Sequence, residues 1–180
     1  MRCIQLCAAL VTITGAALAP SMAEAQCTAS GAPASCSVPG SVSMTAGRVI
    51  RLQVSAGSTA LTAPTPADFD AGFNSTTGPA LTVSANAAWT LSVRASAALW
   101  TATNTSPGAP ARTTKPAADL KWATAANGTF NPLTTTDVLL VGGAATASNA
   151  TTLYFHTLYN WTLDTPGNYS LGVILTLTAP

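Results

Sequence analysis

Apolar and polar side chains alternate through the last residues of the chain. The apolar phase between residues 169 and 178 consists of Tyr169, Leu171, Val173, Leu175 and Leu177. Because successive side chains of a β-strand point to opposite faces, this alternation predicts a closing strand with one buried face. A second alternating stretch covers residues 153–163, with Trp161 in its apolar phase. The chain is therefore expected to end in two strands.

A turn is predicted between these two strands, where residues 164–168 read Asp-Thr-Pro-Gly-Asn. Pro166 fixes φ for the first central position of a type II turn, and Gly167 can adopt the positive φ that the second position needs. Trp161 and Tyr169 flank this turn, much as a tyrosine corner holds strands together in sandwich domains. We interpret all four residues as structural.

Further short strands are predicted along the rest of the chain at residues 38–44, 48–54, 80–84, 89–93 and 119–123, and a short apolar run at residues 136–141 predicts another. The third and fourth of these are predicted to form a hairpin, with Trp89 on its inner face. Residues 57–78 and 97–115 are rich in Pro, Gly and Asn and are predicted to be loops. Many short strands between turns predict an all-β fold, an immunoglobulin-like antiparallel β-sandwich.

The first 25 residues have the pattern of a secretory signal peptide. Arg2 supplies a positive charge, residues 3–18 are mostly apolar, and Ala23 and Ala25 are the small residues before a cleavage site. A membrane anchor is the alternative, but the apolar run is short and contains Thr and Gly. We expect a secreted protein whose mature chain, residues 26–180, is one β-sandwich domain with no membrane span. Periplasm, cell surface and medium all remain open as its location.

The two cysteines left after cleavage are Cys27 and Cys36. Two thiols nine positions apart in an exported chain predict a local disulfide bond. A redox pair or metal site is the alternative, but the spacing is not Cys-x-x-Cys and His156 is the only histidine.

Charge is sparse and balanced, with seven Lys and Arg against six Asp and Glu and a net charge of +1. Nucleic-acid binding needs a concentrated basic face, which this pattern does not provide. The sequence offers no convincing nucleophile–base pair, because His156 is expected on an outer strand face. Asp68 and Asp70 suit turn capping better than a Ca²⁺ site. We therefore predict a protein that is not an enzyme, with no cofactor and no metal.

Tryptophans supply the candidate binding residues. Trp89 and Trp161 lie in apolar strand phases and are expected in the core. Trp100 and Trp122 lie beside loops, where an exposed aromatic ring can stack on the apolar face of a sugar. Closing the ends of the sandwich is the other reading of this second pair. Binding of carbohydrate or peptidoglycan through Trp100 and Trp122 is the alternative function.

Two resemblances suggest a role. Residues 89–91 and 161–163 both read Trp-Thr-Leu and resemble the paired Trp-x-Leu motifs of WxL-type cell-surface domains of exported bacterial proteins. Residues 165–169, Thr-Pro-Gly-Asn-Tyr, lead into an apolar strand and resemble the Pro-Gly-x-Tyr corner of immunoglobulin-like pilin and spore-coat-type domains. Both imply a bacterial structural, adhesive or fibre subunit, with self-association or cell-wall polysaccharide as its partner. Strand addition at an open sheet edge would join such subunits, and the disulfide-anchored N-terminal segment is a candidate for the added strand.

Overall fold

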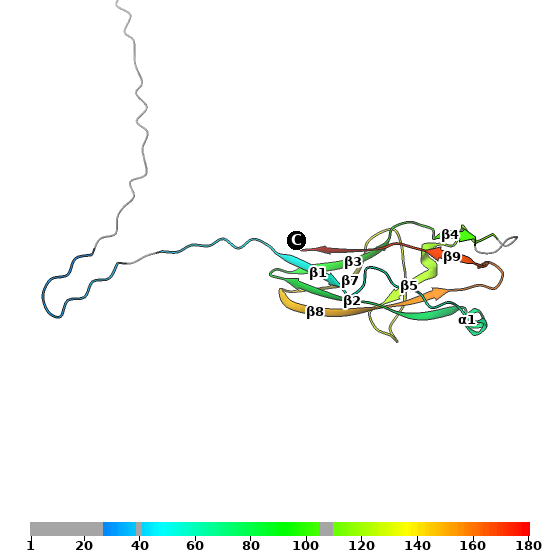
Figure 1. Ribbon diagram of the computed structural model, residues 1–180, viewed down its shortest axis with the longest axis horizontal. Helices are drawn as coiled ribbons and strands as arrows, with labels where there is room; N and C mark the ends of the chain where they lie inside the picture. The colour runs from blue at the N-terminus through cyan, green and yellow to red at the C-terminus, as the bar shows by residue number, and fades with distance from the viewer. Residues whose placement is uncertain (1–26, 39–40, 105–109) are drawn as a thin grey trace, which may run out of the picture. The chain divides into compact units, whose positions relative to one another are not determined.

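A computed structural model describes residues 27–38, 41–104 and 110–180 (Figure 1). The predicted signal peptide lies outside these residues. The chain divides into two units, Met1–Thr45 and Ala46–Pro180. In the first unit a disulfide joins Cys27 to Cys36, as their spacing predicts. The strand predicted near residues 38–44 is not formed by the residues described there, because an extended segment becomes a strand only beside a hydrogen-bonded neighbour.

The second unit is mostly β-structure arranged in several antiparallel sheets (Figure 1). The five-stranded sheet contains, in spatial order, β1 (Ile50–Val54), β2 (Phe73–Ala85), β8 (Thr146–Leu158), β5 (Leu120–Ala123) and β6 (Asn131–Pro132). The three-stranded sheet contains β10 (Val173–Thr178), β3 (Trp89–Ala95) and β7 (Val138–Gly143), and a two-stranded sheet pairs β4 (Thr101–Asn104) with β9 (Gly167–Ser170). Helical structure is confined to α1 (Pro66–Ala71) and the 3₁₀ turn η1 (Ala117–Asp119) in the part of the chain described. No helix there is long and apolar enough to cross a membrane.

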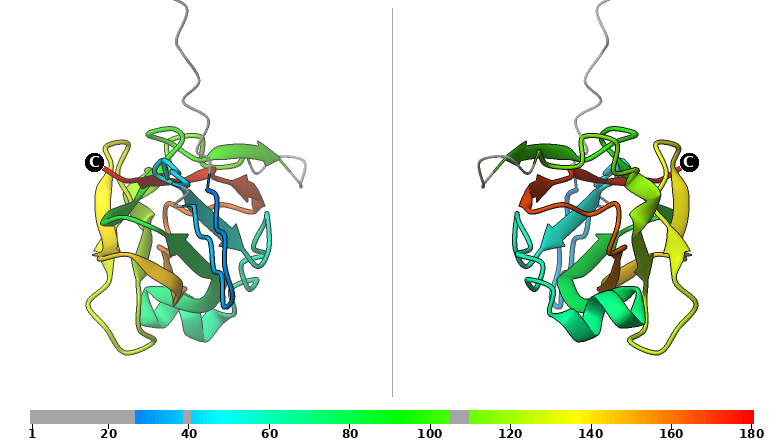
Figure 2. Two further views of the ribbon diagram at one scale, coloured as in Figure 1. Left: turned by 90° about the vertical axis from the view of Figure 1, so that its left-hand side faces the viewer. Right: turned by 90° about the vertical axis from the view of Figure 1, so that its right-hand side faces the viewer.

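The two larger sheets share one hydrophobic core, and Figure 2 shows how the strands of the second unit are arranged. Its centre is formed by alternate residues of three strands, Leu81 and Val83 from β2, Leu153 and Phe155 from β8, and Trp89, Leu91 and Val93 from β3. The spacing of two along each strand is the alternation visible in the sequence. Each fully buried aliphatic side chain of this kind stabilises the fold by about 1.5–3 kcal/mol.

The predicted hairpin of residues 80–84 and 89–93 is wrong, although both strands exist. β2 pairs with β1 and β8, whereas β3 pairs with β10 and β7 in the other sheet. Each strand carries its own row of buried apolar side chains, and the two rows meet across the core. The short connection between them therefore crosses from one sheet to the other.

The predicted closing strand is divided into two pieces. β9 pairs with β4, and β10 pairs with β3 after a break at residues 171–172. All five residues of the apolar phase predicted from the sequence pack, partly buried, against the core. The face is therefore as predicted, while the pairing partner changes along the segment.

The reversal before β9 lies earlier than predicted. β8 ends at Leu158, and the Asn160 side-chain oxygen then accepts hydrogen bonds from the amides of Thr162 and Leu163 at 2.9 and 3.2 Å. Gly167 is not among the described residues with positive φ, so the predicted type II turn is wrong. A Cβ atom on Gly167 would lie 2.7 Å from the Ala111 Cβ atom. The glycine is required by close packing and not by its φ angle.

Two stretches predicted as loops contain short elements. Residues 97–115 include β4, and residues 57–78 include α1 and the start of β2. A capping arrangement begins α1, since the Asp68 carboxylate accepts hydrogen bonds from the backbone amide and the hydroxyl of Thr65, both at 2.7 Å. Gly72 ends the helix with a φ of 79°, in the left-handed region. A six-residue helix is too short to show a helical period in the sequence.

Candidate functional site

A groove of about 720 Å³ runs between two edge strands, β1 and β10. Its walls and floor include Leu52 and Val54 from β1, Val173 and Leu175 from β10, and Leu153 and Phe155 from β8. In the described part of the chain, β1 and β10 each have a hydrogen-bonded neighbour on one side only. We call this opening the edge groove. It combines an apolar floor with strand edges able to accept another strand.

The sequence pattern of β1 shows why the edge groove matters. Ile50, Leu52 and Val54 share one strand phase, yet Ile50 and Val54 remain exposed and Leu52 is only partly buried. These side chains have the spacing of core residues, but no described part of the chain buries them completely. An apolar strip of this kind is a surface available for contact.

A second opening of about 700 Å³ is lined partly by aromatic rings. The ring centroid of Phe69 lies 5.3 Å from that of Tyr159 and 4.6 Å from that of Trp161. The Trp161 indole nitrogen donates a hydrogen bond to the Asp70 carboxylate at 3.0 Å. We call this opening the aromatic cleft.

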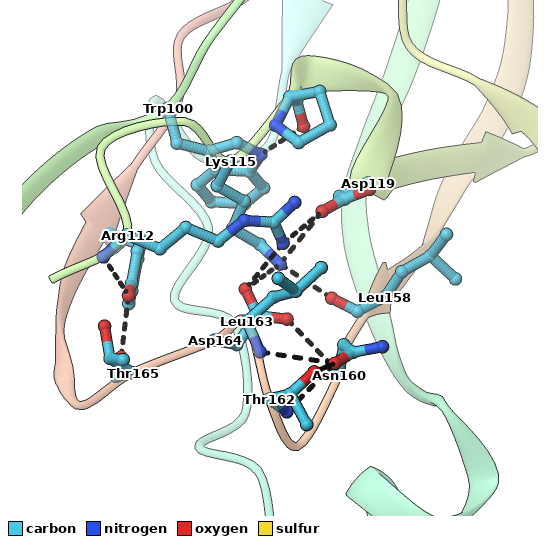
Figure 3. Close-up of polar contacts among 12 residues, drawn as sticks. Trp100, Arg112, Lys115, Asp119, Leu158, Asn160, Thr162, Leu163, Asp164 and Thr165 are labelled. Carbon is cyan, nitrogen blue, oxygen red and sulfur yellow. Dashed lines mark hydrogen bonds and ion pairs between the residues drawn. The ribbon is translucent and has the colours of Figure 1, made fainter.

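A buried cluster of four charges borders the aromatic cleft (Figure 3). The Lys115 ammonium group donates to Asp164 at 2.9 Å, to Asp119 at 3.3 Å and to the backbone oxygen of Leu158 at 2.8 Å. Arg112 contacts the same two carboxylates at 3.0 and 3.1 Å. The Lys115 side chain is only 3% exposed. Two cations and two anions neutralise one another, so the cluster has no net charge.

The electrostatics of Asp164 reflect this cluster. Burial acts to raise the pKa of Asp164, but hydrogen bonds from Lys115 and Arg112 outweigh it and hold the pKa below its ordinary value of 3.8. The backbone amide of Asn160 adds a hydrogen bond to the same carboxylate at 2.8 Å. Asp164 therefore stays ionised at neutral pH and holds the residue 158–164 segment in place.

Tyr169 connects the cluster to β9. Its hydroxyl donates to the Thr165 backbone oxygen at 2.7 Å and accepts from the Arg112 backbone amide at 2.9 Å. The bond to a carbonyl four residues upstream is the kind of contact that a tyrosine corner makes. Pro166 lies beside it in the wall of the aromatic cleft.

The structure revises the expected placement of the tryptophans. Trp100 and Trp122, expected on the surface, are only 5% and 4% exposed, and Trp161, expected in the core, is 59% exposed. Trp122 pairs with Phe155 in the five-stranded sheet and faces inward, and Trp161 follows the end of β8, where strand alternation stops. Trp89 is buried as predicted, and its indole donates to the Ala144 backbone oxygen at 2.9 Å.

The exposed aromatic ring beside a loop is thus Trp161, not Trp100 or Trp122. Trp100 contributes to the lining of the aromatic cleft as a buried residue, with its indole bonded to the Pro116 backbone oxygen at 3.0 Å, whereas Trp122 is not part of it. The signal in the sequence was Asn160, a residue that favours turns, although it lies in the polar phase and leaves the alternation unbroken.

His156 lies on the outer face of the five-stranded sheet, away from both openings. Its ring stacks on Phe130 with centroids 3.3 Å apart and lies 4.6 Å from the Phe73 ring. Burial, followed by the nearby Lys121 charge, lowers the pKa of His156 below its ordinary value of 6.5. No group of three or more His, Cys, Asp or Glu suited to a metal ion occurs within residues 27–38, 41–104 and 110–180.

Neither protein-family models nor curated proteins give a match to this sequence.

Proposed function

We propose that this protein is a non-enzymatic, exported structural subunit with an immunoglobulin-like β-sandwich, whose copies associate by strand addition. The edge groove is the observation that supports this most strongly. A strand laid along it would hydrogen-bond to an open edge and bury alternate side chains against Leu153 and Phe155. Backbone bonds then provide affinity, and pockets for alternate side chains provide specificity.

The proposed occupant is the N-terminal segment of a second copy, at residues 41–45. Val42 and Met44 are almost fully exposed and alternate with Ser41, Ser43 and Thr45. An extended chain with this pattern presents its two large apolar side chains on one face. Burying both would contribute about 3–6 kcal/mol before the entropy of association is subtracted. Such a contact forms reversibly and depends on protein concentration.

Several features of the sequence fit a surface role for such a subunit. The first 25 residues resemble a signal peptide, and charged residues make up only 7% of the chain. The unpaired backbone groups of an open sheet edge pair readily with another chain, so an open edge on an exported protein is consistent with a role in association.

The test measures the oligomeric state with and without an apolar donor segment. Size-exclusion chromatography with light scattering, over a wide range of concentration, is expected to show growth of assemblies, visible as filaments by negative-stain microscopy. A variant with Val42→Asp and Met44→Asp is expected to stay monomeric, because charged side chains cannot enter the apolar groove.

A matched control places the same charges on the opposite face of the segment. The Ser41→Asp and Ser43→Asp variant adds equal charge and is expected to assemble like the unmodified protein. A protein that is monomeric at every concentration, or that responds equally to both pairs of substitutions, would contradict strand addition by this segment. All four positions lie outside the core, so each variant is expected to fold.

A further inference from the structure

The aromatic cleft has the size and lining of a small-molecule site. Its volume of about 700 Å³ falls within the range of about 300–1,000 Å³ that ligand pockets occupy. Phe69, Tyr159 and Trp161 give it apolar ring surface, and Trp161 is largely exposed to solvent. Burial, followed by the charges of Asp164 and Asp68, raises the pKa of Tyr159, so its hydroxyl stays protonated. The wall offers ring faces for stacking and a neutral phenol.

A buried hydroxyl in the lining lacks a partner. Thr157 lines the cleft and is only 4% exposed, yet its side-chain oxygen makes no hydrogen bond to any described residue. The phenol of Tyr159 lies close by, and its interaction with the Thr157 hydroxyl acts to lower the pKa of that phenol, against the larger effect of burial. Buried polar atoms are nearly always paired, and leaving one unpaired costs about 1–3 kcal/mol. The Thr157 oxygen has almost no accessible surface of its own, so a polar group of a ligand would bond it after a small movement of the side chains around it.

The charges beside the cleft favour a neutral ligand. Lys115 and Asp164 are the two charged residues of its described lining, and they bind each other at 2.9 Å. All three protons of the Lys115 ammonium group are directed to protein oxygens. An anionic ligand would have to break these bonds in a buried setting, which is costly.

We infer that the aromatic cleft binds a short neutral saccharide. A pyranose ring has an apolar face that stacks on an aromatic ring and hydroxyl groups at its edge. The exposed ring of Trp161, which packs on Phe69 with centroids 4.6 Å apart, supplies the stacking face, and the Thr157 hydroxyl bonds a sugar hydroxyl. This inference uses different residues from the edge groove, so each can fail without the other. Saccharide binding gives the aromatic cleft an adhesive role.

Isothermal titration calorimetry of the full chain tests this inference. Cellohexaose, chitohexaose and maltohexaose serve as neutral probes, and trigalacturonic acid serves as an anionic one. At least one neutral probe is expected to bind saturably, and the anionic probe is expected to bind more weakly. Trp161→Ala should weaken binding about 5-fold to 160-fold, which corresponds to the 1–3 kcal/mol that stacking on an aromatic ring contributes in single-strand nucleic-acid-binding proteins.

Two further variants make the test specific. Thr157→Val keeps the shape of the side chain and removes its hydroxyl, and it should weaken binding about 2–12-fold. Phe73→Ala removes an exposed aromatic ring outside the cleft and should leave affinity unchanged. Thermal melts of each variant show that the fold is retained.

Three results would overturn the inference. The first is the absence of saturable binding to every neutral probe, and the second is binding that Trp161→Ala leaves intact. The third is equal or tighter binding of trigalacturonic acid. A Thr157→Val variant with unchanged affinity would refute the role given to its hydroxyl.

Discussion

Replacing Lys115 with methionine is expected to destabilise the fold more than any other single loss of charge in this chain. The substitution keeps most of the apolar stem but removes an ammonium group that bonds Asp164, Asp119 and the Leu158 carbonyl at 2.8–3.3 Å. Asp164 has a side chain only 6% exposed, so its carboxylate would be left in a poorly hydrated site.

The expected cost follows from burial. Breaking a buried ion pair by removing one partner costs about 3–5 kcal/mol, because the remaining charge is uncompensated. Arg112 still contacts Asp164 at 3.0 Å after the substitution, which places the expected loss near the lower end, about 3 kcal/mol. With a slope of about 1–3 kcal/mol per molar urea, the unfolding midpoint should fall by roughly 1–3 M.

The assay is equilibrium unfolding in urea, followed by tryptophan fluorescence. Lys121→Met is the matched control, because Lys121 forms no ion pair within the described residues, and it should change stability by less than about 0.5 kcal/mol. Combining Lys115→Met with Asp164→Asn should cost less than the two single changes added together. A loss below about 1 kcal/mol for Lys115→Met, typical of surface pairs, would refute this account of the cluster.

Three further predictions concern single side chains. Tyr169→Phe should lower the free energy of unfolding by about 1–3 kcal/mol, because its hydroxyl makes two hydrogen bonds; Tyr154→Phe is the control in the same denaturation assay. Gly167→Ala should cost about 1–3 kcal/mol and lower the melting temperature, since the added carbon would lie 2.7 Å from the Ala111 Cβ atom; an unchanged melting temperature would contradict this. The pKa of His156 in the folded protein is lower than its ordinary value of 6.5. As the pH drops, the unfolded chain therefore binds a proton at His156 before the folded chain does. The free energy of unfolding should fall as the pH drops below about 6.5 through the folded pKa. His156→Phe should remove that part of the pH dependence, and an identical pH profile for this variant would refute the assignment.

The sequence predicted the class of structure and the buried phases better than the pairing of strands. Alternation of period two is a local property, and it identified the inward residues of β2, β3 and β10 correctly. Which strands become neighbours depends on how the two sheets close over the core. Two strands joined by a short connection usually form a hairpin, but here the connection crosses the core to the other sheet.

The misplaced tryptophans show a second limit of local patterns. The residue 153–163 pattern continues past Leu158, where hydrogen bonding to the sheet ends and the Asn160 turn begins. Trp161 therefore keeps the spacing of a core residue but lies outside the strand. Trp122 was expected to be exposed because loops flank it, yet its short strand lies inside the five-stranded sheet, beside β8.

The charged cluster could not be predicted from the sequence. Lys115 and Asp164 are separated by 49 positions and meet only because the segment before η1 and the segment after β8 lie side by side (Figure 3). In a chain with so few charges, the convergence of four in one buried place is specific to the fold. A single sequence contains no signal for it, because nothing in the predicted turn that contains Asp164 points to the other three residues.

The closing segment links the two candidate sites physically. Gly167, Asn168 and Tyr169 line the aromatic cleft, and Val173 and Leu175 line the edge groove, with the change of sheet partner between them at residues 171–172. The two openings adjoin each other here, because Leu61, Trp100 and Tyr169 line both. β9 and β10 each have one hydrogen-bonded neighbour within the described residues, and β9 is held in addition by the two hydrogen bonds of Tyr169. β9, which these bonds hold in place, suits a preformed ligand site. β10 suits a partner chain that pairs with its outer edge.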